Sequence, residues 1–378
     1  MSVVLARQTV YPAPQMQRPA PGIVFPGEAA PGGGHELASR RFCAGILSAL
    51  RMGESAGDAA RTDYHVPRDT LLLHAAAALG IVSPQQLFGG VVPHAFLATK
   101  VIGHPLVEAD AQAPAGWSHR LAQRMQGCVL PGYSVFGRDD LREAYRRLRG
   151  HGPVRIKCAG ARGGHGQACI GDETALERWM QDLRPQDFED GLAVEPHLEE
   201  VVTFSIGAVE AAGQSIAYSG IQFNTTDGCG RQVYGGSRLQ VRRGTLEALL
   251  EDNATEPGMR QAIAHALQYE RAVREEFPGF FASRRNYDII QGVDGRGQWH
   301  CGVLEQSWRL GGASPAEVLA MRAFADDVAL RQVEAATGEV YGEDAEIPDD
   351  AVIHFRGGLG SAGILTKFAT VRPHGNPA

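Results

Sequence analysis

The chain has 378 residues, 21% of them charged and 44% hydrophobic, and a net charge of −7. These values fit a soluble protein of two or three domains and argue against a nucleic-acid-binding protein, which would carry a basic surface. The longest apolar run, residues 70–82, is too short to span a membrane, and the first residues lack a signal-peptide pattern. Six cysteines without C-x-x-C spacing indicate free thiols, so we expect a cytoplasmic protein.

The first third of the chain is predicted to contain an arm and a small domain. Residues 1–34 form a Pro/Gly-rich arm, because such a composition buries little apolar surface. Residues 35–115 mix short helical and β-like runs, including a helix over 68–81 that ends at a glycine. We interpret this segment as an N-terminal α/β domain.

The middle of the chain alternates clear helices with strands. The spacing predicts a helix over 137–150, with aspartates at its start and Gly150 at its end. A strand over 153–159, a glycine loop and a second strand over 167–171 then form a hairpin. A helix over 173–183 and two β runs within 192–210 follow.

The last part begins with a strand and a long polar loop over 222–238. Loops of this length are usually functional or disordered. A helix over 258–277 precedes a hairpin whose turn is the sequence DGRG, residues 294–297. A final helix is expected over 314–337, and an acidic loop and a closing segment follow it.

Lys157, in the strand before the glycine loop, is a first candidate for chemistry. The chain has only two other lysines, Lys100 and Lys367, among 36 lysines and arginines. Glycine-loop amides and an ammonium group are suited to binding phosphate oxygens. The spacing matches neither a P-loop nor a dinucleotide-binding fingerprint, because a strand follows the loop. An ordinary glycine-rich turn is the alternative.

Two further stretches carry carboxylates at strand ends. Glu195 ends an apolar strand before Pro196, where it is placed either to contact a nucleotide base or to lie in solvent. Asp288 and Glu305 lie in the two strands of the predicted hairpin, so both carboxylates can reach one end of a sheet. Paired carboxylates suit Mg²⁺, and Arg309 can stabilise charge on a transferring phosphoryl group.

The order of these motifs over residues 115–330 resembles the ATP-grasp superfamily, in which two α+β subdomains clamp ATP. The resemblance implies an α+β/α/β chain with a lid subdomain over 116–200, a second subdomain over 201–335 and an extension over 336–378. It implies ATP and Mg²⁺ as cofactors. It assigns phosphate contacts to Lys157, Gly163, Gly164, His165 and Gly166, nucleotide contacts to Glu195, Leu198 and Glu200, metal binding to Asp288, Glu305 and Ser307, and catalytic roles to Lys157 and Arg309.

The chain departs from that pattern at four places, and one is the ribose-binding glutamate, for which Val202 lies near the expected position while Glu199 and Glu200 lie a little early. Ser307 stands where the third metal ligand is usually asparagine, and Asn286 stands where many relatives have arginine. The upstream nucleotide-binding cation has two candidates, Arg120 and Arg124. The whole chain also looks like an uncharacterised bacterial family, a similarity that gives no substrate.

The resemblance implies a ligase that activates a small-molecule carboxylate as an acyl phosphate for attack by an amine. A phosphotransferase, a non-catalytic nucleotide-binding protein and a false resemblance are the alternatives; the last would place Asp288 and Glu305 far apart. The candidate assembly is a homodimer. Candidate substrate contacts are Gln222, Asn224, Tyr234, Arg238, Lys100, Arg356 and Lys367.

Overall fold

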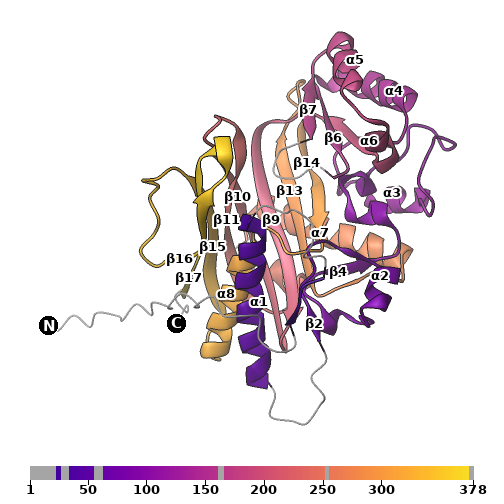
Figure 1. Ribbon diagram of the computed structural model, residues 1–378. Helices are drawn as coiled ribbons and strands as arrows, with labels where there is room; N and C mark the ends of the chain where they lie inside the picture. The colour runs from indigo at the N-terminus through magenta and orange to yellow at the C-terminus, as the bar shows by residue number, and fades with distance from the viewer. Residues whose placement is uncertain (1–22, 27–33, 55–62, 161–165, 252–254, 374–378) are drawn as a thin grey trace.

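An eight-stranded antiparallel sheet, here called the main sheet, forms the centre of the molecule (Figure 1). The computed structural model describes residues 23–26, 34–54, 63–160, 166–251 and 255–373. The strand order is β14-β13-β9-β10-β11-β15-β17-β16. The strands are β9 (Glu199–Ala211), β10 (Gln214–Thr226), β11 (Gln232–Arg243), β13 (Arg284–Val293), β14 (Trp299–Ser307), β15 (Gln332–Tyr341), β16 (Val352–Gly358) and β17 (Ile364–Pro373).

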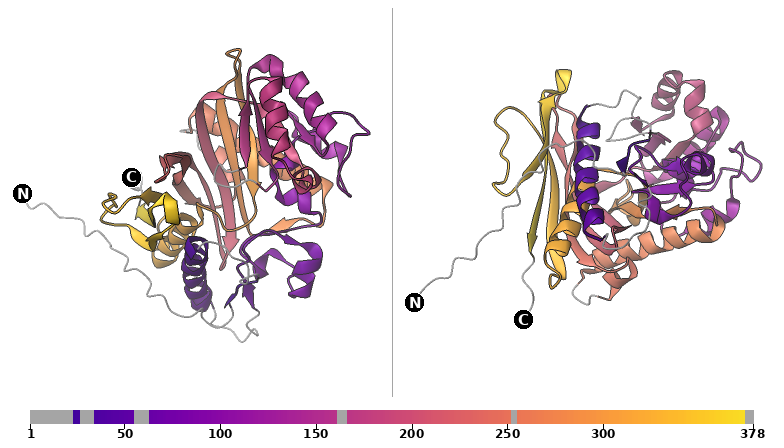
Figure 2. Two further views of the ribbon diagram at one scale, coloured as in Figure 1. Left: turned by 45° about the horizontal axis from the view of Figure 1, so that its top comes forward. Right: turned by 60° about the horizontal axis from the view of Figure 1, so that its bottom comes forward.

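Helices cover both faces of the main sheet, because alternate residues of its strands are apolar on each side. Helix α7 (Pro257–Glu276) packs on one face, where it meets Ile206 and Ile289 in a common core. Helices α1 (Gly34–Glu54) and α8 (Ser314–Asp326) lie side by side on the other face, in a core that includes Val209 and Ile216. Figure 2 shows this layered arrangement from two further sides.

A smaller unit, here called the four-stranded subdomain, lies beside one end of the main sheet (Figure 1). Its strands β5 (Tyr133–Val135), β8 (Leu192–Pro196), β6 (Val154–Cys158) and β7 (Gln167–Ile170) are hydrogen-bonded in that order. Three helices, α4 (Arg138–Leu148), α5 (Glu173–Gln181) and α6 (Pro185–Asp190), belong to this unit. It has its own apolar core, which includes Leu141, Ile156 and Leu192.

Short elements connect these parts. Strands β3 (Leu71–Leu72), β4 (Gly90–Val92) and β12 (Phe281–Ala282) form a three-stranded sheet, and β1 (Ile23–Val24) pairs with β2 (Tyr64–His65). The remaining helices are α2 (Leu73–Ala78), α3 (His119–Met125), and the 3-10 turns η1 (Pro84–Gln86), η2 (Ala95–Ala98), η3 (Lys100–Gly103), η4 (Arg149–His151), η5 (Glu247–Leu250) and η6 (Gly360–Ala362). None of the helices in the described ranges is long and apolar enough to cross a bilayer.

The structure confirms the mixed α+β class and the hairpins β6–β7 and β13–β14. It corrects the expected polar loop over 222–238, which is mostly the paired strands β10 and β11. Their polar side chains line a cavity, and this made two strands look like a loop in sequence. The predicted helix over 68–81 contracts to the six residues of α2.

The predicted helix over 314–337 ends at Asp326, and the residues from Gln332 onward form strand β15. The segment 332–337 mixes apolar and polar residues in a pattern that fits either element, and pairing with β11 and β17 selects the strand. Two expected domain boundaries, at 200/201 and 335/336, therefore fall inside β9 and β15. Helix α1 packs on α8 and the main sheet, although the sequence placed it in a domain with residues 55–115. Most of the expected arm, 1–34, lies outside the described residues.

Candidate active site

A cavity of about 840 Å³ lies between the main sheet, the four-stranded subdomain and the N-terminal parts of α1 and α8. Of the predicted site residues that the structure describes, five line it: Lys157, Asp288, Glu305, Ser307 and Arg309. The suggested substrate contacts Gln222, Asn224, Tyr234, Lys100 and Lys367 line it as well. All three lysines of the chain therefore reach one cavity.

Asp288 and Glu305 are directly opposite each other in the β13–β14 pair. The register shifts between Asp288 and Ile289, so that Ile289 faces Val303 and Leu304 is left between the pairs. This bulge lets Val303 join the α7 core while Glu305 lies on the cavity side. The alternative of a false resemblance, which would place the two carboxylates far apart, is thus wrong.

The electrostatics of the Asp288–Glu305 pair are those of two crowded like charges. Burial, and then the charge of Glu305, raise the pKa of Asp288 to about 7. Asn286 Nδ2 donates a 2.8 Å hydrogen bond to Asp288 Oδ1, and Gln222 also donates to that oxygen. Lys100 forms an ion pair with Glu305. Two hard carboxylate groups with partial neutralisation fit a divalent cation such as Mg²⁺.

Lys157 and Glu195 form a buried ion pair between β6 and β8. His104 Nε2 lies 2.7 Å from the other carboxylate oxygen of Glu195. Burial alone would raise the pKa of Glu195, but Lys157 and His104 lower it to about 2. Glu195 thus holds the Lys157 ammonium at the cavity wall. The resemblance had instead assigned the two residues to different parts of a nucleotide.

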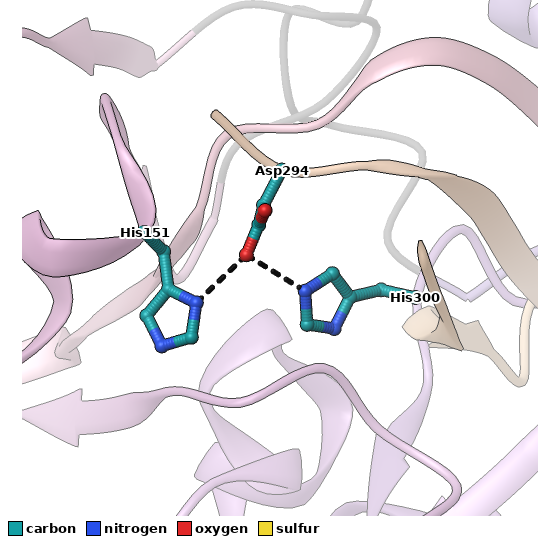
Figure 3. A group of neighbouring side chains, drawn as sticks. All are labelled: His151, Asp294 and His300. Atoms are coloured by element: carbon teal, nitrogen blue, oxygen red, sulfur yellow. Dashed lines mark hydrogen bonds and ion pairs between the residues drawn. The ribbon is translucent and has the colours of Figure 1, made fainter. Parts of the chain in front are cut away.

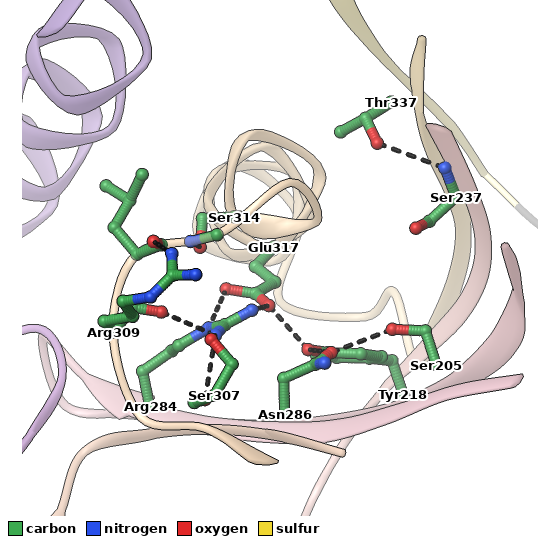
Figure 4. A network of polar contacts seen from close by, with 12 residues as sticks. Ser205, Tyr218, Ser237, Arg284, Asn286, Ser307, Arg309, Ser314, Glu317 and Thr337 are labelled. Carbon is green, nitrogen blue, oxygen red and sulfur yellow. Dashed lines mark hydrogen bonds and ion pairs between the residues drawn. The ribbon is translucent and has the colours of Figure 1, made fainter. Parts of the chain in front are cut away.

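A polar network on the same face of the sheet fixes the loop after β14 (Figure 4). Arg284 and Glu317 form a fully buried pair that joins β13 to α8, with 2.7 Å between Arg284 Nη2 and Glu317 Oε1. Arg284 Nη1 also donates to Ser307 Oγ at 3.1 Å and to the carbonyls of Ser307 and Arg309. Tyr218 donates to Glu317.

These contacts bear on the metal ligand predicted at Ser307. Ser307 Oγ accepts a hydrogen bond from the Arg284 guanidinium. A metal ion bound to this oxygen would therefore share it with the positive charge of Arg284. Asn286, which stands where the resemblance implies an arginine, accepts a hydrogen bond from Ser205, lies 2.8 Å from the Tyr218 hydroxyl through the same oxygen, and donates to Asp288. Asn286 thus orients Asp288.

Several predicted residues lie elsewhere. Gly163, Gly164 and His165 fall outside the described residues, and Gly166 is exposed with φ of +70°. Glu195, Leu198 and Glu200 are not among the cavity-lining residues in the described part of the chain. Arg120 and Arg124 form ion pairs with Glu275 and Glu276 of α7. Arg238 and Arg356 are also not among the described residues that line the cavity.

Comparison with known proteins identifies a family. Residues 28–369 match the model described as "Protein of unknown function (DUF3182)", and the chain belongs to that family. This confirms the uncharacterised family expected from the sequence. A search of the curated proteins finds no match.

Solved structures similar to this one include two kinds of enzyme. A biotin carboxylase from Campylobacter jejuni has 12% identity and a TM-score of 0.47, over 89% of this chain and 75% of its own. D-alanyl-alanine synthetase A from Vibrio cholerae has 11% identity and a TM-score of 0.45, over 79% of this chain and 92% of its own. D-alanine–D-alanine ligase from Bacillus anthracis has 14% identity and a TM-score of 0.43, over 82% of this chain and 91% of its own. At identities of 11–14% and TM-scores below 0.5, these likenesses assign no reaction to this chain.

Proposed function

We propose that this chain is a Mg-ATP-dependent ligase that converts a carboxylate substrate to an acyl phosphate, which an amine then attacks. The observation that carries the proposal is the Asp288–Glu305 pair, set opposite Lys100 in a cavity that Lys157 and Arg309 also line. Acidic pairs are costly next to each other unless a cation relieves their repulsion. The cavity volume also lies in the range of about 300–1,000 Å³ usual for small-molecule sites.

The donor set fits Mg²⁺ at Asp288 and Glu305, because Mg²⁺ prefers carboxylate oxygens together with phosphate oxygens. Ser307 remains the third predicted ligand. Magnesium held there would neutralise charge on the phosphates of ATP. The chain's own contribution is positioning: Lys157 and Lys100 offer ammonium groups, and Arg309 offers a guanidinium, to the same anionic substrate.

The proposed reaction balances in two steps. A carboxylate oxygen of the substrate bonds to the γ-phosphorus of ATP while the bond to ADP breaks, and ADP leaves. The amine nitrogen then bonds to the acyl carbon, phosphate leaves, and the amine loses a proton to solvent. Exclusion of water matters because water would otherwise hydrolyse the acyl phosphate.

The first test is thermal unfolding of the wild type with and without millimolar Mg-ATP. A ligand that binds the folded state raises its unfolding midpoint. We expect a rise for the wild type and a much smaller one for Asp288→Asn. Asp350→Asn is the matched control, because Asp350 pairs with Arg372 and is not among the cavity-lining residues. No response of the wild type would overturn nucleotide binding, and with it the ligase.

The second test separates a ligase from the alternative phosphotransferase. Pools of small carboxylates and amines are supplied with ATP, and phosphate, ADP and products are measured. A ligase releases phosphate only when both a carboxylate and an amine are present. A phosphorylated product without phosphate release would favour the phosphotransferase. ATP binding without turnover across the pools would favour a non-catalytic nucleotide-binding protein.

A further inference from the structure

His151, Asp294 and His300 form a compact cluster (Figure 3), and they are not among the residues that line the cavity. His151 Nδ1 lies 2.7 Å, and His300 Nε2 lies 3.0 Å, from Asp294 Oδ2. The three donor atoms all lie within 4.8 Å of one another. Asp294 and His300 are buried, and His151 is partly exposed. Two imidazole nitrogens and a carboxylate oxygen are a donor set that Zn²⁺ prefers.

The cluster joins two parts of the fold. His151 ends η4, between α4 and β6 of the four-stranded subdomain, and Asp294 and His300 flank the turn of the β13–β14 hairpin. Close backbone contact holds the two parts at this spacing. A Cβ on Gly152 would lie 2.8 Å from Gly295 Cα, so both positions require glycine.

The carboxylate of Asp294 is oriented before any ligand arrives. Its Oδ1 accepts hydrogen bonds from the backbone amides of Arg296 and Gln298, at 2.9 and 3.0 Å, which leaves Oδ2 directed at the histidines. Such outer hydrogen bonds are typical of carboxylates that bind metals.

We propose that His151, Asp294 and His300 bind one zinc-type divalent ion, which ties the four-stranded subdomain to the β13–β14 hairpin. Tetrahedral zinc places its ligand atoms about 3.3 Å apart, given bonds of roughly 2.0–2.1 Å. The nitrogen–oxygen separations of 2.7 and 3.0 Å would lengthen by roughly 0.3–0.6 Å to reach this, and the two histidine nitrogens, which lie within 4.8 Å of each other, would draw together around the ion. Three protein ligands leave the fourth position to water. This site is separate from the all-oxygen pair Asp288–Glu305 and does not depend on the proposed reaction.

The test is calorimetric titration of the chelator-treated full chain with Zn²⁺, in the presence of excess Mg²⁺. The background carries Cys169→Ser and Cys229→Ser, because these two free thiols are exposed and would bind zinc. We expect one saturable site and a zinc-dependent rise in the unfolding midpoint. Titration with Co²⁺ should give the visible absorption of a four-coordinate ion without a thiolate band.

Variants assign the site. His300→Ala and His151→Ala should each weaken zinc binding at least about 100-fold, since changes to mere outer-shell partners already cost 10–100-fold. His119→Ala, an exposed histidine on α3, and Asp288→Asn should leave binding unchanged. His151 is partly exposed, so its variant tests the site even if His300→Ala fails to fold. Absence of saturable zinc binding, or binding that survives both histidine variants, would overturn the proposal and leave a hydrogen-bonded triad.

Discussion

Lys157 and Glu195 are in direct contact, and each is at most 4% exposed at the side chain. The ammonium that we propose to bind phosphate therefore has an anionic partner before any substrate arrives. Removing one member of a buried pair leaves the other charge uncompensated, which is strongly destabilising. The pair thus links the stability of the four-stranded subdomain to the candidate site.

Glu195→Gln should lower the free energy of unfolding by about 3–5 kcal/mol at pH 7, because Lys157 is left buried and unpaired. Urea unfolding measures this loss. Glu199→Gln, at an exposed position four residues away, should stay within about 0.5 kcal/mol of the wild type.

The same pair predicts a pH dependence. The folded pKa of Glu195 is depressed from 4.5 to about 2, so its stabilisation is present above about pH 4.5 and is lost as the pH falls toward 2. The stability gap between wild type and Glu195→Gln should therefore narrow over that window. A gap that stays constant from pH 7 to pH 3 would contradict the assignment.

A double variant separates the structural and ligand-binding roles of Lys157. Lys157→Met with Glu195→Gln removes both charges, so it should recover most of the stability lost in Glu195→Gln alone. Its unfolding midpoint should nevertheless not rise when Mg-ATP is added. If the double variant recovers both its stability and the midpoint rise with Mg-ATP, Lys157 does not contact phosphate.

Asp288→Asn should stabilise the chain when no divalent ion is present. Its folded pKa is raised to about 7 from 3.8, so the ionised group costs stability increasingly as the pH rises from about 4 to 7, and fully above 7. We expect the unfolding midpoint of the variant to exceed that of the wild type by about 2–6 °C at pH 8 and by little at pH 4. A midpoint below that of the wild type at pH 8 would argue that Asp288 is already compensated.

Addition of Mg²⁺ should raise the unfolding midpoint of the wild type above that of Asp288→Asn. Protons compete with the ion for Asp288, so stabilisation of the wild type by Mg²⁺ should be large at pH 8 and fade below about pH 7. Chelation should abolish it. Differential scanning fluorimetry across pH measures the effect, and Asp288→Asn should show almost none at any pH.

Much of the candidate site could be predicted from sequence. Lys157 attracts notice because lysine is so rare in this chain, and the same reasoning applies to Lys100 and Lys367, which line the same cavity. The hairpin signal around residues 294–297 correctly predicted that Asp288 and Glu305 share one end of a strand pair. Local patterns of this kind are set by strand periodicity and turn residues.

The rest depends on contacts between segments far apart in sequence. Arg284 and Glu317 lie in different elements, and neither has a local pattern that marks the other as its partner. The bulge beside Leu304 is likewise invisible in the sequence, although it decides which side of the sheet Glu305 lies on. Arg284 and Glu317 were missed for this reason; two charged residues within apolar runs are the only signal they offer.

Glu317→Gln tests that buried pair. The variant leaves Arg284 without its anionic partner, so it should cost about 3–5 kcal/mol of unfolding free energy and loosen the loop that carries Arg309. Asp326→Asn, on the same helix but in an exposed pair with Arg322, should cost no more than about 1 kcal/mol. Equal losses in the two variants would contradict a special role for Arg284. Chemical unfolding provides the measurement.

Strand β15 lies between β11 and β17, and this position has a consequence for shortened versions of the chain. Ending the chain at residue 335, where the sequence suggested an extension, would remove most of β15 together with β16 and β17. Residues 236–238 of β11 would lose their β15 partners, and the short remnant of β15 would lose β17, so backbone donors and acceptors would be left open along a sheet edge. Such an edge recruits strands from other copies, so the truncated protein would be expected to aggregate even though every cavity residue before position 335 is retained.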